Sequence, residues 1–139
     1  MQPTSSLLDQ LKNHGSAVAL LLLLMIILVL FKKFILGSTA SDDEIRHYLR
    51  EGAFIIDVRS RGEVSSSGLF PGAVNIPMGE LLEFPISQQP LLPRDREHSK
   101  IIVYCASGMR SASVQNTLKE MGFRNVLNGG GLSNMMRFK

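Results

Sequence analysis

Residues 100–123 read KIIVYCASGMRSASVQNTLKEMGF, and this stretch decides the fold. The β-branched apolar run KIIVYC predicts a buried strand that ends at Cys105. The segment RSASVQNTLKEMGF predicts a helix, because Val114, Leu118 and Met121 recur at helical spacing and a glycine follows them. A strand, a short glycine-containing loop and a helix in this order are typical of an α/β protein with a parallel sheet.

The same alternation continues on both sides of this stretch. SDDEIRHYLREG, residues 41–52, predicts a helix whose capping box is formed by Ser41 and Glu44, and AFIID, residues 53–57, predicts a short buried strand. We further expect a polar loop over 60–68, a strand near 74–76, a helical turn over 78–83, a loop over 84–99, a strand at 125–127, a glycine turn over 129–131 and a terminal helix over 132–138. This order predicts a parallel sheet with helices on both faces.

The N-terminal part contains a long apolar segment. Every residue from 17 to 31 is apolar, and counting through Leu36 gives twenty positions, which suffices to cross a hydrocarbon core of ~30 Å. Lys32 and Lys33 would then reach the lipid headgroups. The predicted organisation is a polar leader over 1–16, a single-pass transmembrane helix over 17–36, a linker over 37–40 and a folded domain over 41–139.

Two other interpretations of the apolar segment stay open. A cleaved signal peptide would use Lys12 as its charged region and the small residues of 37–40 as its cleavage site. A buried helix of a soluble protein is disfavoured, because a small domain can hardly enclose a helix that is apolar all round. For a retained anchor, the two lysines after the span favour a cytoplasmic domain, and we expect a location in a bacterial inner membrane.

Charge and cysteine content narrow the function classes. The chain carries a formal charge of +3, but beyond residue 37 it has twelve basic and eleven acidic residues, so its basicity belongs largely to the membrane flank. We therefore expect no nucleic acid among its partners. A single cysteine excludes an internal disulfide and a multi-cysteine zinc site and suits a reducing compartment. His14, His47 and His98 lack metal-ligand spacing, so no metal is expected.

Cys105 stands where ligands bind in parallel α/β proteins, at the carboxyl end of a strand and before a helix. Backbone N–H groups of a tight loop converge on one point, and the helix dipole adds to their positive potential. A sulfur at that point would be stabilised as the nucleophilic thiolate. Gly108 lets the loop curl, and Arg110 could add a cation or brace the loop. The alternative is a buried cysteine that only packs.

Four stretches of residues 53–132 carry a resemblance to a known family. FIIDVRS, GLFPGAVNIP, the stretch around Cys105 and NVLNGGG occur in the order and with the spacing of a small single-domain rhodanese, a sulfurtransferase. The resemblance implies a rhodanese-like three-layer sandwich in which a parallel sheet of about five strands lies between helices, the α/β class that the alternation of strands and helices already predicts.

The resemblance also implies a chemistry. Cys105 would be the nucleophile, which takes the outer sulfur of a small anionic donor such as thiosulfate or a persulfide and passes it from a covalent persulfide to cyanide or a thiol, without a separate cofactor. Asp57 and Arg59 match the family's Asp-x-Arg segment, either as an ion pair that fixes the loop or as substrate contacts. The backbone amides that would cradle the sulfur belong to Ala106, Ser107, Gly108, Met109 and Arg110.

The sequence departs from the family pattern at two places, and other functions share the fold. Leu69 stands where many relatives have histidine, and Met135 and Met136 lie where a last-helix aromatic is common. Phosphatases and arsenate reductases of this fold have a longer loop than the four residues between Cys105 and Arg110. A sulfur-relay or regulatory module tethered beside a membrane protein is the main alternative to an enzyme, with the lipid bilayer as a partner in both cases.

Overall fold

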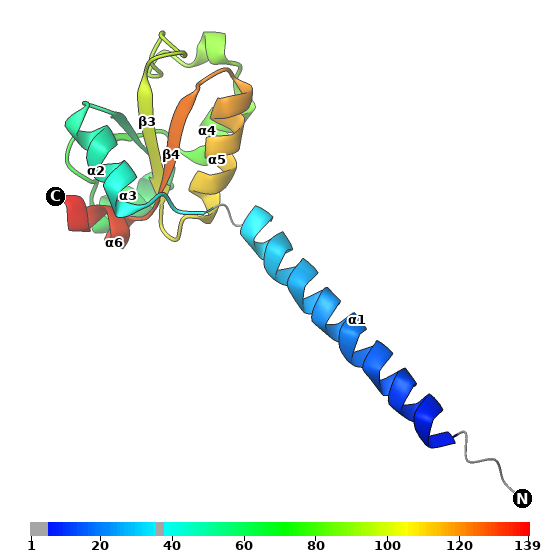
Figure 1. The fold of residues 1–139 in the computed structure, drawn as a ribbon. Helices are drawn as coiled ribbons and strands as arrows, with labels where there is room; N and C mark the ends of the chain where they lie inside the picture. The colour runs from blue at the N-terminus through cyan, green and yellow to red at the C-terminus, as the bar shows by residue number, and fades with distance from the viewer. Residues whose placement is uncertain (1–5, 36–37) are drawn as a thin grey trace, which may run out of the picture. The chain divides into compact units, whose positions relative to one another are not determined.

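The computed structural model describes residues 6–35 and 38–139, which separate into an N-terminal helix and a folded domain. Helix α1 (Ser6–Ile35) contains the predicted transmembrane segment as far as Ile35 (Figure 1). Its segment Lys12–Lys32 has a hydropathy of 2.7 and no buried residues, so its length and composition suffice to cross a membrane, as those of a signal sequence also do. Leu36, Gly37 and residues 1–5 lie outside the described residues.

The domain alternates helices and strands around one parallel sheet. The sheet has the order β2-β1-β3-β4, and each neighbouring pair is parallel, which confirms the predicted α/β class. It has four strands in residues 38–139 instead of about five. The elements are α2 (Asp42–Arg50), β1 (Phe54–Asp57), α3 (Arg61–Ser67), β2 (Val74–Asn75), α4 (Met78–Glu83), a 3-10 turn (Ile86–Gln88), β3 (Lys100–Cys105), α5 (Met109–Glu120), β4 (Asn125–Gly131), α6 (Leu132–Met135) and a 3-10 turn (Met136–Phe138).

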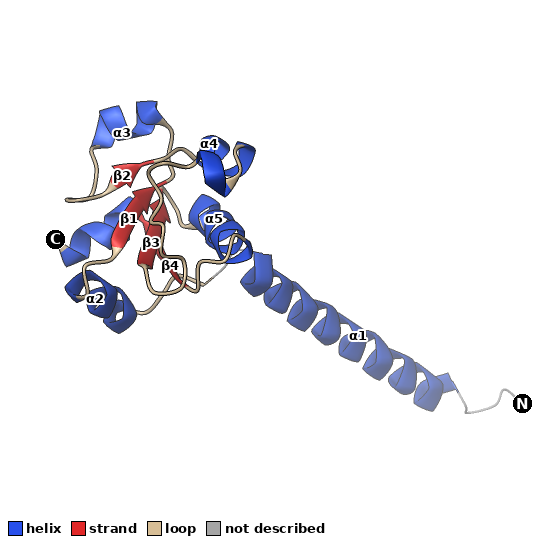
Figure 2. Ribbon diagram, turned by 90° about the horizontal axis from the view of Figure 1, so that it is seen from above, coloured by secondary structure: helices blue, strands red, loops and turns tan. Residues whose placement is uncertain are grey.

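Helices cover both faces of the sheet, as the pattern of the sequence predicts. Figure 2 shows α4 and α5 on one side of the strands, and α2 and α6 on the other. Alternate residues of β3 enter the two cores because successive side chains of a strand point to opposite faces. Val103 packs with Val114 and Leu118 of α5, whereas Ile102 packs with Ile45 of α2. Because β3 is packed on both faces, the position of its last residue, Cys105, at the carboxyl end of the sheet is fixed.

Helix α3 replaces the loop that we predict over residues 60–68, and that prediction is wrong. Ser60 is the N-cap residue, and its side chain accepts a hydrogen bond from the backbone N–H of Glu63. The Glu63 carboxylate in turn accepts one from the N–H of Ser60, at 2.9 Å. This reciprocal capping box supplies partners for two backbone donors at the helix start. It offsets the low helix propensity of the serine-rich segment.

The predicted turn at residues 129–131 is also wrong, because these glycines form the end of β4. A Cβ atom on Gly129 would lie 2.6 Å from the sulfur of Met135 and 2.9 Å from a methyl carbon of Ile102. Glycine is therefore required by close packing, and the space it leaves is filled by Met135, which is fully buried. Met135 thus serves as core filler.

Candidate active site

Cys105 is the last residue of β3, and its side chain is fully buried at the start of the loop that leads to α5. The backbone N–H of Gly108 donates a hydrogen bond to the cysteine sulfur at 3.0 Å. The hydroxyl oxygen of Ser111, in the first turn of α5, lies 3.4 Å from the same sulfur. The structure therefore places the sulfur at the N-terminus of a twelve-residue helix, where the dipole favours negative charge.

Gly108 determines how tightly the loop closes around the sulfur. Its φ angle of +91° lies in the left-handed region, which residues with a Cβ atom rarely adopt. A Cβ atom at this position would also lie 3.1 Å from the Cα atom of Gly130 in β4, and 3.7 Å from the hydroxyl oxygen of Thr39. The loop thus packs closely against β4 and against the segment that leads into the domain from the N-terminal side.

The environment of Cys105 favours its ionised form. Burial raises the pKa of the thiol, but hydrogen bonds from Ser111 and from the backbone N–H groups of Ser107 and Gly108 act in the opposite direction and together outweigh burial. The pKa of Cys105 consequently lies below the ordinary value of a thiol. A larger share of thiolate at neutral pH makes the sulfur a better nucleophile and metal ligand.

Asn128 of β4 holds the Ser111 side chain in place. The hydroxyl of Ser111 donates to the Asn128 side-chain oxygen at 2.7 Å, and that oxygen also accepts from the N–H of Gly130 at 2.9 Å. The Asn128 amide nitrogen donates to the carbonyl oxygen of Gly108 at 3.1 Å. Asn128 and Ser111 are both buried. One amide therefore connects the loop, the helix start and the last strand.

Sequence analysis missed Ser111 and Asn128. Ser111 carries a usable signal, because a polar residue one position after Arg110 in the first turn of a helix lies close to the preceding loop. Nothing in the sequence distinguishes Asn128 from the exposed asparagines of the chain, since its partners Ser111, Gly108 and Gly130 are joined to it only by the fold.

Asp57 and Arg59 form a buried, two-armed ion pair at the carboxyl end of β1. The Arg59 Nη2 atom lies 2.7 Å from an Asp57 oxygen, and the two side chains are 3% and 0% exposed. The Nε atom of Arg59 lies 3.0 Å from both Asp57 oxygens. Nη1 donates to the hydroxyl of Ser67, and Nη2 also donates to the carbonyl of Gly68, each at 2.6 Å. Arg59 therefore fastens the end of α3 to the end of β1.

Arg110 is also paired, with a carboxylate that we did not expect. Its two terminal nitrogens donate to the two carboxylate oxygens of Glu63 at 2.8 Å and 2.7 Å. The pair braces the start of α5 against the start of α3 and is about one-third exposed. The spacing of Ser60 and Glu63 is a capping-box signal that would have found α3 and hence Glu63. The guanidinium group braces the loop instead of standing free at its rim.

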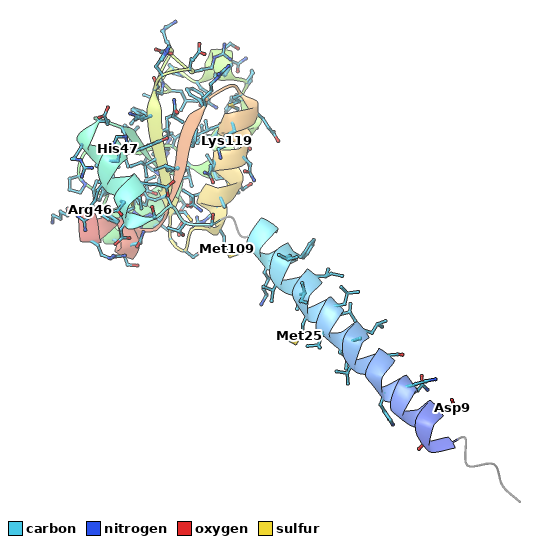
Figure 3. All side chains as sticks on the ribbon, in the orientation of Figure 1. Asp9, Met25, Arg46, His47, Met109 and Lys119 are labelled. Atoms are coloured by element: carbon cyan, nitrogen blue, oxygen red, sulfur yellow. The ribbon has the colours of Figure 1, made fainter. Side chains whose placement is uncertain are left out.

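The other loop residues lie at the surface. Ala106, Ser107 and Met109 are exposed, and Met109 leaves 57% of its area in solvent at the start of α5 (Figure 3). Leu69 is 37% exposed, and the N–H of its neighbour Phe70 donates to the buried Tyr104 hydroxyl at 2.9 Å. Of the predicted loop residues, Ser107 and Gly108 provide backbone amides to the sulfur, and Ala106, Ser107 and Met109 present uncharged side chains to solvent.

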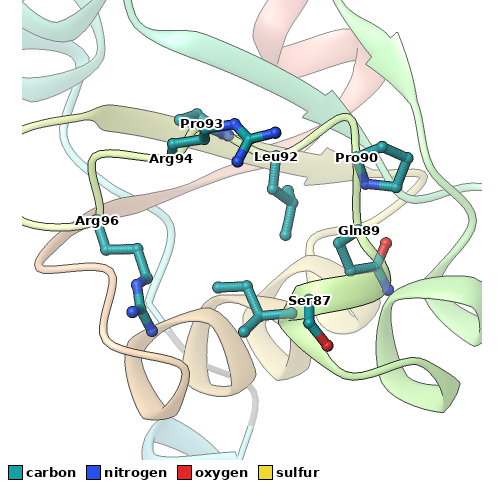
Figure 4. Close-up of a pocket in the computed structure, with 8 residues that line it drawn as sticks. Ser87, Gln89, Pro90, Leu92, Pro93, Arg94 and Arg96 are labelled. Carbon is teal, nitrogen blue, oxygen red and sulfur yellow. The ribbon is translucent and has the colours of Figure 1, made fainter.

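A cavity of about 310 Å³ lies elsewhere, between the 3-10 turn Ile86–Gln88 and the segment that precedes β3 (Figure 4). Ser87, Gln89, Arg94 and Arg96 contribute to its lining. This segment leads into Lys100, the first residue of β3, whereas Cys105 is the last. The cavity therefore belongs to the opposite end of the strand and takes no part in the cysteine site.

Comparisons with known proteins agree with this geometry. The family model described as rhodanese-like domain matches residues 41–134. Human thiosulfate:glutathione sulfurtransferase is 33% identical over 101 residues, which cover 67% of this chain and 87% of the relative. YtwF of Bacillus subtilis (strain 168) is 39% identical over 82 residues, which cover 59% of this chain and 72% of the relative.

A solved structure shows the same fold. The human single-domain sulfurtransferase TSTD1 superposes with a TM-score of 0.58 at 28% identity, over 74% of this chain and 99% of that protein. The family match spans more than half of the chain and includes every element of the cysteine site from β1 to β4. The chain therefore belongs to the rhodanese family, and its relatives include sulfurtransferases.

Proposed function

We propose that this chain is a membrane-anchored sulfurtransferase that moves a sulfane sulfur from a donor such as thiosulfate to a thiol or cyanide. The observation that supports this most directly is the lone Cys105 sulfur, which lies at the start of α5 and accepts a hydrogen bond from the N–H of Gly108 at 3.0 Å. A site of this kind stabilises one negatively charged sulfur atom.

In the proposed reaction the Cys105 thiolate attacks the outer sulfur of the donor. A bond forms between the two sulfur atoms, the sulfur–sulfur bond of the donor breaks, and the donor leaves with the bonding electron pair, as sulfite in the case of thiosulfate. The outer sulfur of the Cys105 persulfide is then attacked by the acceptor, which regenerates the thiolate. The amides of the loop stabilise the negative sulfur in both states, and no further cofactor is needed.

The anchor is part of the proposal. The apolar segment Lys12–Lys32 would cross the membrane once, and Lys32 and Lys33 would lie at the cytoplasmic surface, on the side of the rhodanese domain. Fusing the C-terminus to green fluorescent protein or to alkaline phosphatase in a bacterial host tests this. We expect fluorescence and no phosphatase activity, since the phosphatase folds only outside the cytoplasm. Phosphatase activity without fluorescence would reverse the assigned topology.

The catalytic proposal is tested on the full chain in detergent micelles. Thiosulfate should add one sulfur atom to the intact protein, as mass spectrometry detects, and cyanide should remove it with repeated turnover. Cys105→Ser should show neither step, and Ser113→Ala, an exposed serine of α5, serves as the control. A persulfide that forms once but does not turn over would favour a sulfur relay to a partner protein. Absence of any sulfur on Cys105 would favour a binding module.

A further inference from the structure

The charges around the cysteine site specify the class of sulfur donor. Resting on the function proposed above, we infer that the preferred donor is the persulfide of a small thiol (R–S–SH) and that Glu63 disfavours the dianion thiosulfate by neutralising Arg110. The inference follows from the pairing of the cations at this edge of the sheet, from the way Glu63 is held and from the chemistry of the loop surface.

Three arginines lie in the segments that directly follow β1 and β3 at the carboxyl edge of the sheet, and each is paired with a carboxylate. Arg59 is buried against Asp57, with a shortest distance of 2.7 Å. Arg110 makes two hydrogen bonds to Glu63, and Arg61 of α3 lies 2.7 Å from Glu80 of α4. An incoming anion therefore meets neutral pairs. The uncompensated positive potential comes from backbone amides and the α5 dipole, and the Cys105 thiolate already occupies it.

Glu63 is not free to make way for an anion. One of its carboxylate oxygens accepts from the Ser60 N–H at 2.9 Å as well as from Arg110. The hydrogen bonds from Arg110 and Ser60 hold the pKa of Glu63 well below its usual range, so the carboxylate stays charged throughout the neutral region. An anion that displaced Glu63 from Arg110 would leave the Glu63 carboxylate without its cation and would disturb the N-terminus of α3.

The outer surface of the loop suits a leaving group whose outer portion carries no charge. Cys105 is buried and the two residues after it, Ala106 and Ser107, are exposed, so the terminal sulfur of a donor would enter the loop while the remainder of the donor stays at the surface. That surface consists of a methyl group, a hydroxyl and the exposed thioether of Met109. The sulfite portion of thiosulfate brings two negative charges to this place, whereas the carbon portion of a thiol persulfide can pack on Met109.

The transfer from a persulfide is balanced without an added oxidant or reductant. The Cys105 thiolate attacks the terminal sulfur of R–S–SH, the bond between the two donor sulfurs breaks, and R–S⁻ leaves. The proton carried by the transferred sulfur then passes to the released thiolate, so that Cys105–S–S⁻ and R–SH are the products. Both states of Cys105 carry a single negative charge, which matches the one position provided by the Gly108 N–H and its neighbours.

The test compares 2-hydroxyethyl persulfide and thiosulfate as donors to the full chain in detergent micelles, with kcat/KM as the readout. In Glu63→Gln, the charge of Arg110 is no longer neutralised by a carboxylate, and glutamine can still complete the capping box with Ser60. We expect this variant to use thiosulfate about tenfold better, because a free cation attracts a dianion. It should use the persulfide, whose reacting form R–S–SH is uncharged, within about twofold of the unaltered chain. Glu51→Gln frees Lys100 at the amino end of β3 and should change neither value.

Ionic strength provides a second measurement on the unaltered chain. Because each of the three arginines described after β1 and β3 is paired, added salt should change the thiosulfate kcat/KM of the unaltered chain by less than about twofold. The value for Glu63→Gln should fall severalfold. Equal or lower thiosulfate use by Glu63→Gln, or a steep salt dependence of the unaltered chain, would overturn the inference. A Cys105 that accepts sulfur from neither donor would instead refute the proposed function, so the two failures are distinguishable.

Discussion

Replacing Arg59 by methionine tests whether the Asp57–Arg59 pair braces the fold or contacts the substrate. In this variant Asp57 stays buried and loses its cation, and Ser67 and Gly68 lose their guanidinium donor. Removing one partner of a buried ion pair costs about 3–5 kcal/mol, because an uncompensated charge remains in a medium that solvates it poorly. For a domain of this size each kcal/mol lowers Tm by roughly 4–8 °C, so we expect a decrease of about 12–40 °C.

The double variant Asp57→Asn/Arg59→Met separates loss of a brace from burial of a charge. It removes both charges, and we expect it to recover about 1.5–3 kcal/mol relative to Arg59→Met alone. Near-ultraviolet circular dichroism of the full chain in micelles follows the unfolding, because Tyr104 is fully buried and the chain has no tryptophan. Persulfide formation on Cys105 is measured in parallel, well below each transition.

Bracing predicts that both variants, once folded, still accept sulfur on Cys105 at rates within about tenfold of the unaltered chain. The reasoning is refuted if the free energy of unfolding of Arg59→Met lies within about 1 kcal/mol of that of the unaltered chain and the variant nevertheless forms no persulfide. That result would make the guanidinium group a substrate ligand. A double variant less stable than Arg59→Met would contradict the assignment of the cost to the buried charge.

Four further predictions follow from the same geometry. Ser111→Ala should raise the pKa of Cys105, so the absorbance titration of the thiolate should shift to higher pH, whereas the control Ser113→Ala should leave it unchanged. An unshifted titration in Ser111→Ala would show that Ser111 does not stabilise the thiolate. Asn128→Ala removes the acceptor of the Gly130 N–H and of the Ser111 hydroxyl and one of the two donors to the Gly108 carbonyl, so denaturant unfolding should show a loss of about 2–3 kcal/mol. An unchanged midpoint would contradict this. Gly131→Ala should abolish persulfide formation even where the chain still folds, because a Cβ atom there would overlap the carbonyl oxygen of Ala106, and retained activity would show that the loop adapts. Because the pKa of Glu63 is lower in the folded state than its ordinary 4.5, its contribution to stability is present above that value and is lost as pH falls below it, so acid titration of the unfolding midpoint should be flatter in Glu63→Gln.

Local patterns were sufficient for the parts of the fold that local physics determines. The run KIIVYC forms β3, and the helical spacing of Val114 and Leu118 forms α5, because both segments bury apolar residues at the period of their own secondary structure. The capping box of Ser41 and Glu44 likewise begins α2. The position of Cys105 at a strand end follows from these segments alone.

The two wrong predictions have different physical causes. The α3 segment is rich in serine, which favours turns, and the capping box at Ser60 decides against that tendency. The glycines of β4 read as a turn in the sequence, but Gly129 lies in the sheet because the side chains of Met135 and Ile102 require the space. That requirement depends on residues that meet only in the folded chain, so no local pattern contains it.

The chemistry of the site likewise depends on which residues meet in the fold, and the types of residue in the sequence do not settle it. The sequence contains Arg59 and Arg110 at positions that suit anion binding, and a count of charges would describe a cationic cleft. Each guanidinium group is instead neutralised by a carboxylate, Arg59 by Asp57 two residues before it and Arg110 by Glu63 forty-seven residues before it. Because the field at Cys105 depends on charges that remain unpaired, we expect Glu63 to determine which donor the site accepts as much as the loop around the sulfur does.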